Sequence, residues 1–352
     1  MGKVLRTLPF KPFLKIPEQG GKYEIIQQGN EPIIGYANGE PCEDFINTVI
    51  FGDHTLSLYK PKQPFFVATD GVRILQGTND MDGYYLLSLL EGNSPQSEGY
   101  KRYYSILADR EVLFTENHYE QVEIGLYFKN LDNLITLHQR KYDKLVNVKK
   151  AMLEKMFPKD GSDVPEIRFK GFTEAWEQRK LGDVAIREST TVMSSDKNPS
   201  IEYEDVVSEE GRLNKDIQLK DMQKSGIAFN GSQVLYGKLR PYLHNWLNPN
   251  FSGVAVGDWW VLKPNKIDKN FLYRLIQTQK FDDVANQSAG SKMPRADWNL
   301  VSNTIFDIPY SVDEQSKIAK TFTNIDRLIT LHQRKLEKLK NLKKACLEKM
   351  FV

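Results

Sequence analysis

Apolar side chains recur at alternating steps of three and four residues in two long stretches of this chain. They fall at Ile124, Phe128, Leu131, Ile135, Tyr142, Leu145 and Met152, and again at Ile318, Phe322, Ile325, Ile329, Leu336, Leu339 and Cys346. This spacing is typical of the seam of a coiled coil. Neither stretch has an internal proline, and Pro158 directly follows the first. The pattern predicts two long helices, over 124–157 and 318–351.

The two stretches are copies of one another. Residues 120–157 (EQVEIGLYFKNLDNLITLHQRKYDKLVNVKKAMLEKMF) align without gaps with residues 314–351 (EQSKIAKTFTNIDRLITLHQRKLEKLKNLKKACLEKMF) at an offset of 194, and 25 of the 38 aligned residues are identical. Chance does not produce this degree of self-similarity, so the repeat is an architectural feature. We therefore expect two halves, each a variable segment followed by the same closing helix.

Two seams of equal length can satisfy each other as an antiparallel pair, or they can recruit helices from other chains, and both arrangements can hold at once. About 30 residues at a rise of 1.5 Å give roughly 45 Å, the length of about 13 base pairs of DNA. The predicted seam comprises Phe128, Leu131, Ile135, His138 and Leu145 in the first copy and Phe322, Ile325, Ile329, His332 and Leu339 in the second. We interpret the two histidines as packing residues and not as metal ligands or catalysts.

The variable segments, 5–119 and 185–310, show no obvious similarity to each other. Both alternate short β-branched or aromatic runs, such as NTVIFGDHTLSLY and SGVAVGDWWVLK, with turns rich in Gly, Asn, Asp and Pro. This alternation predicts mixed α+β domains with several strands. Short amphipathic helices are expected over Gly83–Glu91 and Lys269–Ala285.

Charge is unevenly distributed along the chain. Residues 1–119 carry 11 Lys and Arg against 15 Asp and Glu, residues 185–310 carry 15 of each, and residues 311–352 carry 10 against 5. A protein that holds DNA alone by neutralising many phosphates normally has a basic domain. The composition therefore argues weakly against tight DNA binding by this chain alone.

Several polar loop clusters nevertheless have the chemistry of a nucleic-acid contact. Arg, Asn and Gln can bond base edges, while Lys and Ser suit phosphate oxygens. The candidates in the first segment are Gln27, Gln28, Asn30, Lys101, Arg102 and Tyr103. Those in the second are Lys238, Arg240, Tyr242, Asn286, Gln287, Ser291, Lys292 and Arg295.

The sequence carries none of the enzyme motifs sought. It has no GxxxxGK[ST] loop, GxGxxG fingerprint, HExxH or GxSxG, and no Asn/Asp-Pro-Pro-aromatic tetrapeptide. Cys42 and Cys346 are too few for a disulfide framework and have no metal-ligand neighbours. No apolar run is long enough to cross a bilayer and no secretory signal is apparent, so the cytoplasm is the expected compartment.

The repeat and its surroundings resemble the specificity subunits of type I restriction–modification systems. The resemblance rests on the duplicated element EQ…I…F…(L/I)D.LITLHQRK…L…KK..LEKMF and on PEIRFKGFTEAWEQRKLGDV at 165–184. The segments YEIIQQGNEPIIGY, FGDHTLSLY, VLYGKLRPYL and SAGSKMPRADW also look like target recognition domains of that family. The resemblance covers essentially the whole chain.

The resemblance implies a non-catalytic protein with two target recognition domains, separated by two long helices that form an antiparallel coiled coil. Each domain would read one half of an asymmetric, interrupted site in double-stranded DNA, and the helices would set the spacing. The helices would also dock two modification (methyltransferase) subunits, which restriction (translocase and nuclease) subunits join. This chain would bind no cofactor or metal, because S-adenosylmethionine, ATP and Mg²⁺ would be used by the partner subunits.

On this interpretation the chain divides into a first target recognition domain at 1–119, a first spacer helix and linker at 120–164, a second domain with its leader at 165–310, and a second spacer helix at 311–352. Met1-Gly2-Lys3-Val4 matches Leu181-Gly182-Asp183-Val184, so the first half is shorter by about 16 residues of leader. A scaffold that binds proteins and not DNA, and an enzyme without a familiar motif, are the alternatives.

Overall fold

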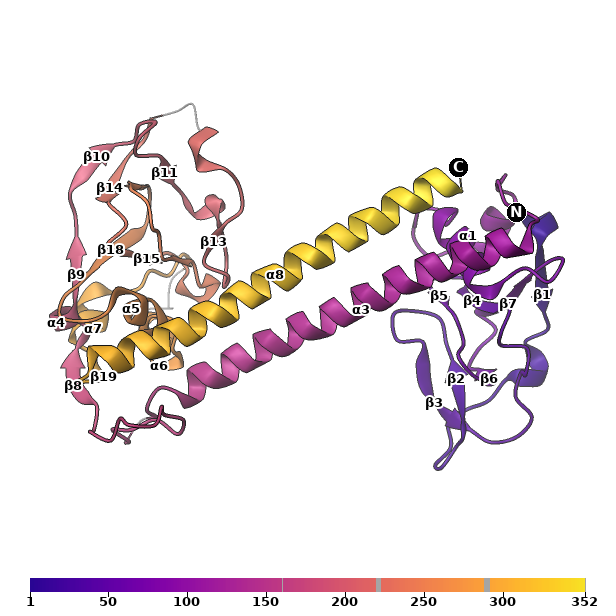
Figure 1. Ribbon diagram of the computed structural model, residues 1–352, viewed down its shortest axis with the longest axis horizontal. Helices are drawn as coiled ribbons and strands as arrows, with labels where there is room; N and C mark the ends of the chain where they lie inside the picture. The colour runs from indigo at the N-terminus through magenta and orange to yellow at the C-terminus, as the bar shows by residue number, and fades with distance from the viewer. Residues whose placement is uncertain (160, 220–222, 288–291, 352) are drawn as a thin grey trace. The chain divides into compact units, whose positions relative to one another are not determined.

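The computed structural model describes residues 1–159, 161–219, 223–287 and 292–351, which fall into two compact units. Unit 1 comprises Met1–Lys141 and Leu331–Val352, and unit 2 comprises Tyr142–Thr330. Each unit therefore combines one variable segment with part of both long helices, α3 (His118–Lys155) and α8 (Val312–Met350) (Figure 1). The two long helices predicted from the repeat are confirmed.

Both helices begin before the apolar seam, and capping side chains explain where. The Asn117 side chain accepts hydrogen bonds from the backbone N–H of Tyr119 (3.0 Å) and Glu120 (3.4 Å). The Ser311 hydroxyl accepts one from the backbone of Glu314 (3.4 Å). Asn and Ser are favoured at this position because they satisfy amide groups that lack a partner within the helix.

Unit 1 contains two sheets and two short helices. The first sheet has the order β1 (Leu5–Leu8), β7 (Val72–Gly77), β4 (Thr48–Gly52) and β5 (Leu58–Tyr59). The second has the order β3 (Ile33–Ala37), β2 (Tyr23–Ile26) and β6 (Phe65–Val67). The helices are α1 (Gly83–Gly92) and α2 (Tyr104–Ala108), with single turns η1 (Gly2–Val4) and η2 (Lys11–Phe13).

Unit 2 contains two four-stranded sheets. The first has the order β9 (Ala185–Glu188), β18 (Trp259–Pro264), β15 (Val234–Gly237) and β16 (Trp246–Leu247). The second has the order β10 (Thr191–Met193), β14 (Ser225–Phe229), β17 (Gly253–Ala255) and β11 (Ser200–Ile201). Two strand pairs are β8 (Glu177–Lys180) with β19 (Ile305–Ile308) and β12 (Val206–Val207) with β13 (Arg212–Leu213). The helices are α4 (Leu181–Val184), α5 (Lys269–Leu275), α6 (Gln279–Ala285) and α7 (Trp298–Asn303), with turns η3 (Tyr203–Asp205), η4 (Ile217–Leu219) and η5 (Pro241–Leu243).

The two variable segments share a sheet topology although their sequences do not align obviously. In each unit the strand that follows the Gly2 or Gly182 turn is the edge of an antiparallel four-stranded sheet, ordered β1-β7-β4-β5 in unit 1 and β9-β18-β15-β16 in unit 2. A short helix, α1 or α5, packs against this sheet. The mixed α and β character predicted for both segments is confirmed, and the helix predicted over Lys269–Ala285 is divided where Thr278 caps α6.

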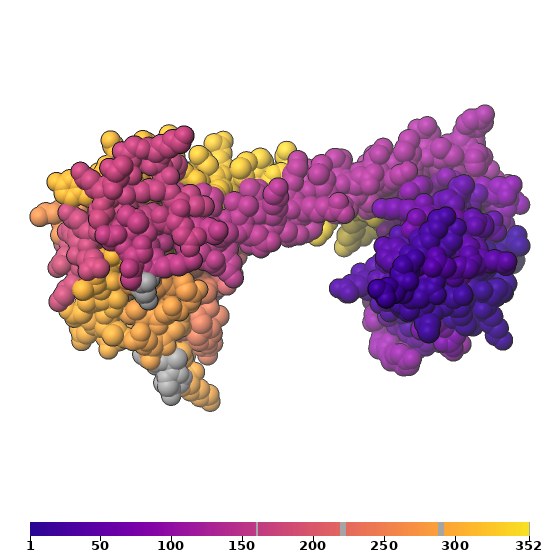
Figure 2. Space-filling view, turned by 90° about the horizontal axis from the view of Figure 1, so that it is seen from below, coloured from indigo at the N-terminus to yellow at the C-terminus, as the bar shows by residue number. Residues whose placement is uncertain are grey.

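The hydrophobic core of each unit includes residues of both copies of the repeat. Phe128, Leu131 and Phe351 are buried in unit 1 with Tyr85 and Leu86 of α1, and Phe157 and Phe322 are buried in unit 2 with Phe271 of α5. Among the other predicted seam residues, Ile325 is buried, and Ile135, His138, Leu145, Ile329, His332 and Leu339 are half-buried. The space-filling view shows each variable segment as a closely packed body (Figure 2).

A buried glutamine joins each variable segment to the repeated helix. Gln315 accepts a hydrogen bond from the backbone N–H of Asp268 (2.7 Å), which caps α5, and donates one to the carbonyl of Pro309 (2.8 Å). Gln121 makes the equivalent bonds in unit 1, from Asp82 (3.2 Å) and to Thr115 (2.7 Å). Both glutamines are at most 4% exposed. The Gln of the repeated EQ pair therefore joins each long helix to the adjacent domain by two hydrogen bonds.

The repeat also places an acid and a base together in each unit. In unit 1 the Lys343 ammonium lies 2.6 Å from Asp132 and 2.7 Å from Glu91 of α1. In unit 2 the equivalent helix residues, Lys149 and Asp326, lie 2.7 Å apart, and Asp326 also binds Arg274 of α5 at 2.6 Å. The helix of the variable domain adds a third charged residue to each pair, which is the acid Glu91 in unit 1 and the base Arg274 in unit 2.

Contacts between the helices progress in opposite chain directions. In unit 1 Asp132 pairs with Lys343, and further along α3 His138 lies 2.8 Å from His332, Nδ1 to Nδ1. At this distance one ring donates its proton and the other accepts it, so the accepting ring is neutral and the two rings are not both charged. Burial lowers the pKa of both histidines, and Lys141 and Lys335 lower it further, with His138 itself adding to the effect on His332.

Replacing Gln315 by leucine is expected to destabilise unit 2 by about 2–4 kcal/mol, because the Asp268 N–H and the Pro309 carbonyl lose their partner inside the core. All five tryptophans of the chain, from Trp176 to Trp298, lie in this unit, so tryptophan fluorescence during urea unfolding measures it selectively. Gln218→Leu, at an exposed position, is the control. Equal urea midpoints for the two variants would show that the Gln315 hydrogen bonds do not stabilise unit 2.

Acidification is expected to weaken the His138–His332 contact. Because the folded protein holds both pKa values below the ordinary value of about 6.5, it binds fewer protons than the unfolded chain, and stability falls as the pH drops through that range. Urea unfolding followed by circular dichroism at pH 8 and pH 5.5 should show a larger loss for the native chain than for His138→Leu/His332→Leu. His118→Leu, at an exposed position, should behave like the native chain.

Candidate nucleic-acid interface

Two loops that sequence analysis singled out in the second segment lie side by side in unit 2. The first continues from β15 through Lys238 to Arg240, and the second contains Pro294 and Arg295. The backbone N–H of Arg240 donates to the carbonyl of Pro294 (2.7 Å), and that of Ala296 donates to the carbonyl of Lys238 (2.8 Å). The predicted clusters at 238–242 and 292–295 therefore form one surface.

A carboxylate between the loops organises their cations. Asp258 lies 3.0 Å from the Arg295 guanidinium and 3.4 Å from the Lys238 ammonium. Burial raises the pKa of Asp258, but Arg295 and Lys238 outweigh this and keep it below its ordinary value. Arg295 is half exposed, so the ion pair orients a guanidinium that still reaches solvent. Charge-assisted bonds of this kind fix geometry without requiring a basic domain.

The same surface contains backbone of unusual conformation. Arg240 and His244 flank η5 with φ of 47° and 52°, and Glu209, bonded through its N–H to the carbonyl of His244, has φ of 64°. Left-handed φ values in residues other than glycine cost about 1 kcal/mol or more each, and they concentrate at functional sites. Arg240 is exposed, and Tyr242 between the two is 51% exposed.

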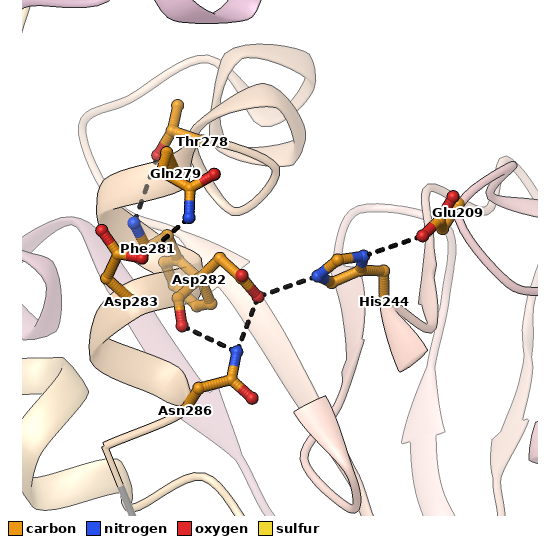
Figure 3. A network of polar contacts seen from close by, with 8 residues as sticks. All are labelled: Glu209, His244, Thr278, Gln279, Phe281, Asp282, Asp283 and Asn286. Atoms are coloured by element: carbon orange, nitrogen blue, oxygen red, sulfur yellow. Dashed lines mark hydrogen bonds and ion pairs between the residues drawn. The ribbon is translucent and has the colours of Figure 1, made fainter. Parts of the chain in front are cut away.

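A polar network connects this strained turn to α6 (Figure 3). The His244 ring lies between two carboxylates, with Nδ1 3.3 Å from Glu209 and Nε2 2.9 Å from Asp282, and it stacks on Trp246 with ring centroids 5.2 Å apart. The Asn286 amide donates to the carbonyl and the carboxylate of Asp282, at 2.9 and 2.8 Å. Asn286 therefore positions the turn through its own side chain.

The two clusters predicted in the first segment also come together, through Gln28 and His54. The Gln28 side chain accepts from the backbone N–H of His54 (3.1 Å), and the His54 Nδ1 lies 3.1 Å from the carbonyl of Lys101. The His54 ring stacks on Tyr100, which is 88% exposed. Beneath them buried Asp53 accepts hydrogen bonds from the backbone N–H of Tyr104 and from the Arg73 side chain.

The candidate residues differ in how far their side chains reach solvent. Asn30, Arg102, Arg240, Tyr242, Gln287, Lys292 and Arg295 are exposed, while Gln27, Gln28, Lys101, Lys238 and Asn286 are half-buried. Tyr103 is buried at 0% exposure, with its hydroxyl bonded to the Gly99 carbonyl, so its side chain belongs to the core and not to the surface. Ser291 lies outside the described residues. Contact of any of these side chains with DNA stays a prediction.

Sequence reasoning did not find the acids that organise both surfaces. Asp258 stands in the apolar run GVAVGDWWVL, and Asp53 directly follows the apolar run TVIFG. A lone acid in a buried strand pattern is a usable signal, because a buried charge requires a partner. The partners themselves, Arg73, Lys238 and Arg295, come from distant positions and could not be inferred.

Within the described ranges, no group of three or more His, Cys, Asp or Glu side chains could hold a metal ion. A search of the same residues found no helix long and apolar enough to cross a membrane.

Known proteins resemble this chain in domain, sequence and fold. Residues 173–341 match the type I restriction modification DNA specificity domain. The chain is 26% identical over 254 residues to the type I restriction enzyme MjaVIII specificity subunit of Methanocaldococcus jannaschii, covering 64% of this chain and 57% of that protein. It is 28% identical over 128 residues to the EcoDI specificity subunit of Escherichia coli, covering 35% of this chain and 28% of that protein.

The chain thus spans little more than half the length of the first relative and less of the second. A crystal structure of a type I restriction–modification S subunit from M. genitalium has a TM-score of 0.62 at 16% identity, over 100% of this chain and 94% of that one. At that identity the likeness concerns the fold alone. Over residues 173–341 the chain is therefore similar to the type I restriction modification DNA specificity domain, and the relatives and the fold agree with that match.

Proposed function

We propose that this chain is the DNA-specificity subunit of a type I restriction–modification complex, and that each variable domain reads one half of an interrupted site in double-stranded DNA. The observation that carries the proposal is that two domains of unlike sequence share the topology of one four-stranded sheet and are each followed by a copy of the same helix. A shared topology suits a shared task, and unlike loops suit different sequences. Specificity subunits of this family are non-catalytic, and we assign the chemistry to partner subunits.

The candidate surface of unit 2 suits base reading more than tight stand-alone binding. Arg240 and Arg295 can form paired bonds to a guanine edge, and Lys292 can meet a phosphate. The 185–310 segment carries no net charge, so phosphate neutralisation by this domain is limited. Modification subunits would supply further grip on DNA together with S-adenosylmethionine, and restriction subunits would use ATP and Mg²⁺.

The repeated helices offer a surface for two copies of one partner. Leu134 and Leu137 of the first LITL string are 44% and 46% exposed, and their repeat equivalents Leu328 and Leu331 are 44% and 45% exposed. Large apolar side chains exposed at the same positions of both copies favour docking of two identical modification subunits.

We also propose that α3 and α8 pair along their length as an antiparallel coiled coil that sets the distance between half-sites. The opposite progression of contacts within unit 1 supports this pairing. Helices of 38 and 39 residues are about 57 Å long at 1.5 Å per residue.

Methylome sequencing tests DNA specificity. Cells that express the chain with its cognate modification subunit should gain one bipartite methylated motif that cells without the chain lack. Arg240→Gly should reduce methylation of that motif. The affinity of the assembled complex for DNA that carries the motif should fall about tenfold, and that affinity should depend less steeply on salt concentration. Lys266→Gly is the matched control, because it removes one exposed cation of similar φ (54°) in the same unit.

The two variants separate DNA reading from folding, since glycine relieves the left-handed strain at either position. Absence of a new motif from cells in which the complex assembles would overturn the proposal. Equal loss of affinity in both variants would place the reading surface elsewhere.

Lengthening the helices tests whether they set the distance between the half-sites. One added heptad in both helices should widen the gap in the methylated motif by roughly 10 Å, about three base pairs. Insertion into a solvent-exposed loop is the control. A motif with an unchanged gap would show that other contacts set the spacing.

A further inference from the structure

The loop that joins β4 to β5 in unit 1 is the counterpart of the loop that joins β15 to β16 in unit 2. Both loops connect equivalent neighbouring strands of the shared four-stranded sheet. The first loop residue is Asp53 in unit 1 and Lys238 in unit 2, and each donates its backbone N–H to a carbonyl 2.9 Å away, that of Gly71 or Asp258. Since the loop of unit 2 contains Arg240, the loop of unit 1 holds the corresponding place in its own domain.

A second loop meets the first in the same way in both units. The carbonyl of the first loop residue accepts a hydrogen bond of 2.8 Å, from the N–H of Tyr103 before α2 in unit 1 and from that of Ala296 before α7 in unit 2. The carbonyl two residues earlier accepts from the backbone of Arg240 in unit 2, but lies 3.1 Å from the ring of His54 in unit 1. In unit 1 a side chain therefore makes the contact that the backbone makes in unit 2.

Three contacts fix the His54 ring and its backbone. Its Nδ1 faces the Lys101 carbonyl, its backbone N–H donates to the Gln28 side chain (3.1 Å), and its ring stacks on Tyr100 with centroids 4.7 Å apart and planes 6° from parallel. A carbonyl oxygen can only accept, so Nδ1 carries the hydrogen of this contact. In the neutral ring Nε2 is then a hydrogen-bond acceptor of fixed direction.

The Nε2 atom of His54 is available to a ligand. It has no hydrogen-bond partner among the residues that the structure describes, and it is not one of the enclosed side-chain atoms that lack a partner, so it reaches solvent. Leu56, in the same loop, has φ of 60°, as Arg240 has φ of 47° in the counterpart loop. Left-handed backbone in residues other than glycine concentrates at functional sites. Arg102, which follows the carbonyl that holds the ring, is exposed and suits a phosphate oxygen.

We propose that His54 reads one base of the first half-site, by accepting at Nε2 a hydrogen bond from the exocyclic amino group of an adenine or a cytosine in the major groove. This inference rests on the proposed function and assigns a specificity-determining residue to the first domain. The amino groups of adenine and cytosine are the donors of the major groove, where guanine and thymine present acceptors. The stack on Tyr100 holds the ring in place before DNA arrives, so less conformational entropy is lost on binding.

Base analogues without the amino group test this contact once the methylated motif is known. Purine replaces adenine, or pyrimidinone replaces cytosine, at each position of the first half-site in turn. At one position we expect the analogue to weaken binding by the native complex about tenfold, and to have no effect on a complex with His54→Asn. Asparagine keeps an N–H donor near the position of Nδ1 and has no acceptor at that of Nε2. Analogues in the second half-site are the internal control, because both complexes should respond to them alike.

Two further variants separate base reading from loop structure. His54→Gln places a carbonyl oxygen near the position of Nε2 and should restore part of the preference for the amino group. His54→Phe keeps a ring to stack on Tyr100 but loses both nitrogens, so it should behave like His54→Asn. The thermal unfolding midpoint of each complex is measured beside its binding. If all three variants weaken binding to native and analogue DNA equally and lower that midpoint, His54 is a structural residue and the inference fails.

The same experiment distinguishes failure of this inference from failure of the proposed function. A bipartite motif whose analogues affect the native and His54→Asn complexes equally would overturn the inference and leave the proposed function standing. A native complex that assembles but produces no bipartite motif would overturn both.

Discussion

The hydrogen bonds of one buried glutamine per unit hold each variable domain on its helix. Gln121 and Gln315 each contact the backbone at the start of a domain helix and at the end of the last domain segment. All four bonds go to backbone atoms, so they do not depend on which side chains the domain carries. The loops of the domain can therefore change in sequence while the domain stays attached to its helix, because these hydrogen bonds require only that the main-chain groups keep their positions.

The local features of the fold were predictable from the sequence, and the long-range ones were not. The repeat and its seam spacing predicted α3 and α8, because helical periodicity is a local signal. The shared topology of the domains depends on pairings such as β1 with β7, some 70 residues apart, which leave no pattern in either strand. The candidate clusters were found as short strings, but their meeting through Asp258 or His54 was not. Tyr103 was a candidate because Lys101 and Arg102 stand among the tyrosines of YKRYYS, and the string itself does not show which tyrosine the core buries.

The internally paired cations of the candidate surface explain how a domain without net charge can present basic groups. Lys238 and Arg295 share the carboxylate of Asp258, which balances one of their two positive charges within the protein. Such groups gain little from counterion release, but they are held in place before a ligand arrives, and the entropy lost on binding is smaller. For the proposed reading of DNA, this arrangement favours discrimination between sequences over affinity.

The acid and base at matching positions of the two helices bear on whether one variable domain can be exchanged for another. Asp132 with Lys343, and Lys149 with Asp326, offer either sign of charge to whatever domain helix lies beside them. One domain answers with Glu91 and the other with Arg274. A domain that arrived by recombination would find a partner for a charge of either sign at this position, so the helices would tolerate foreign domains without compensating mutations.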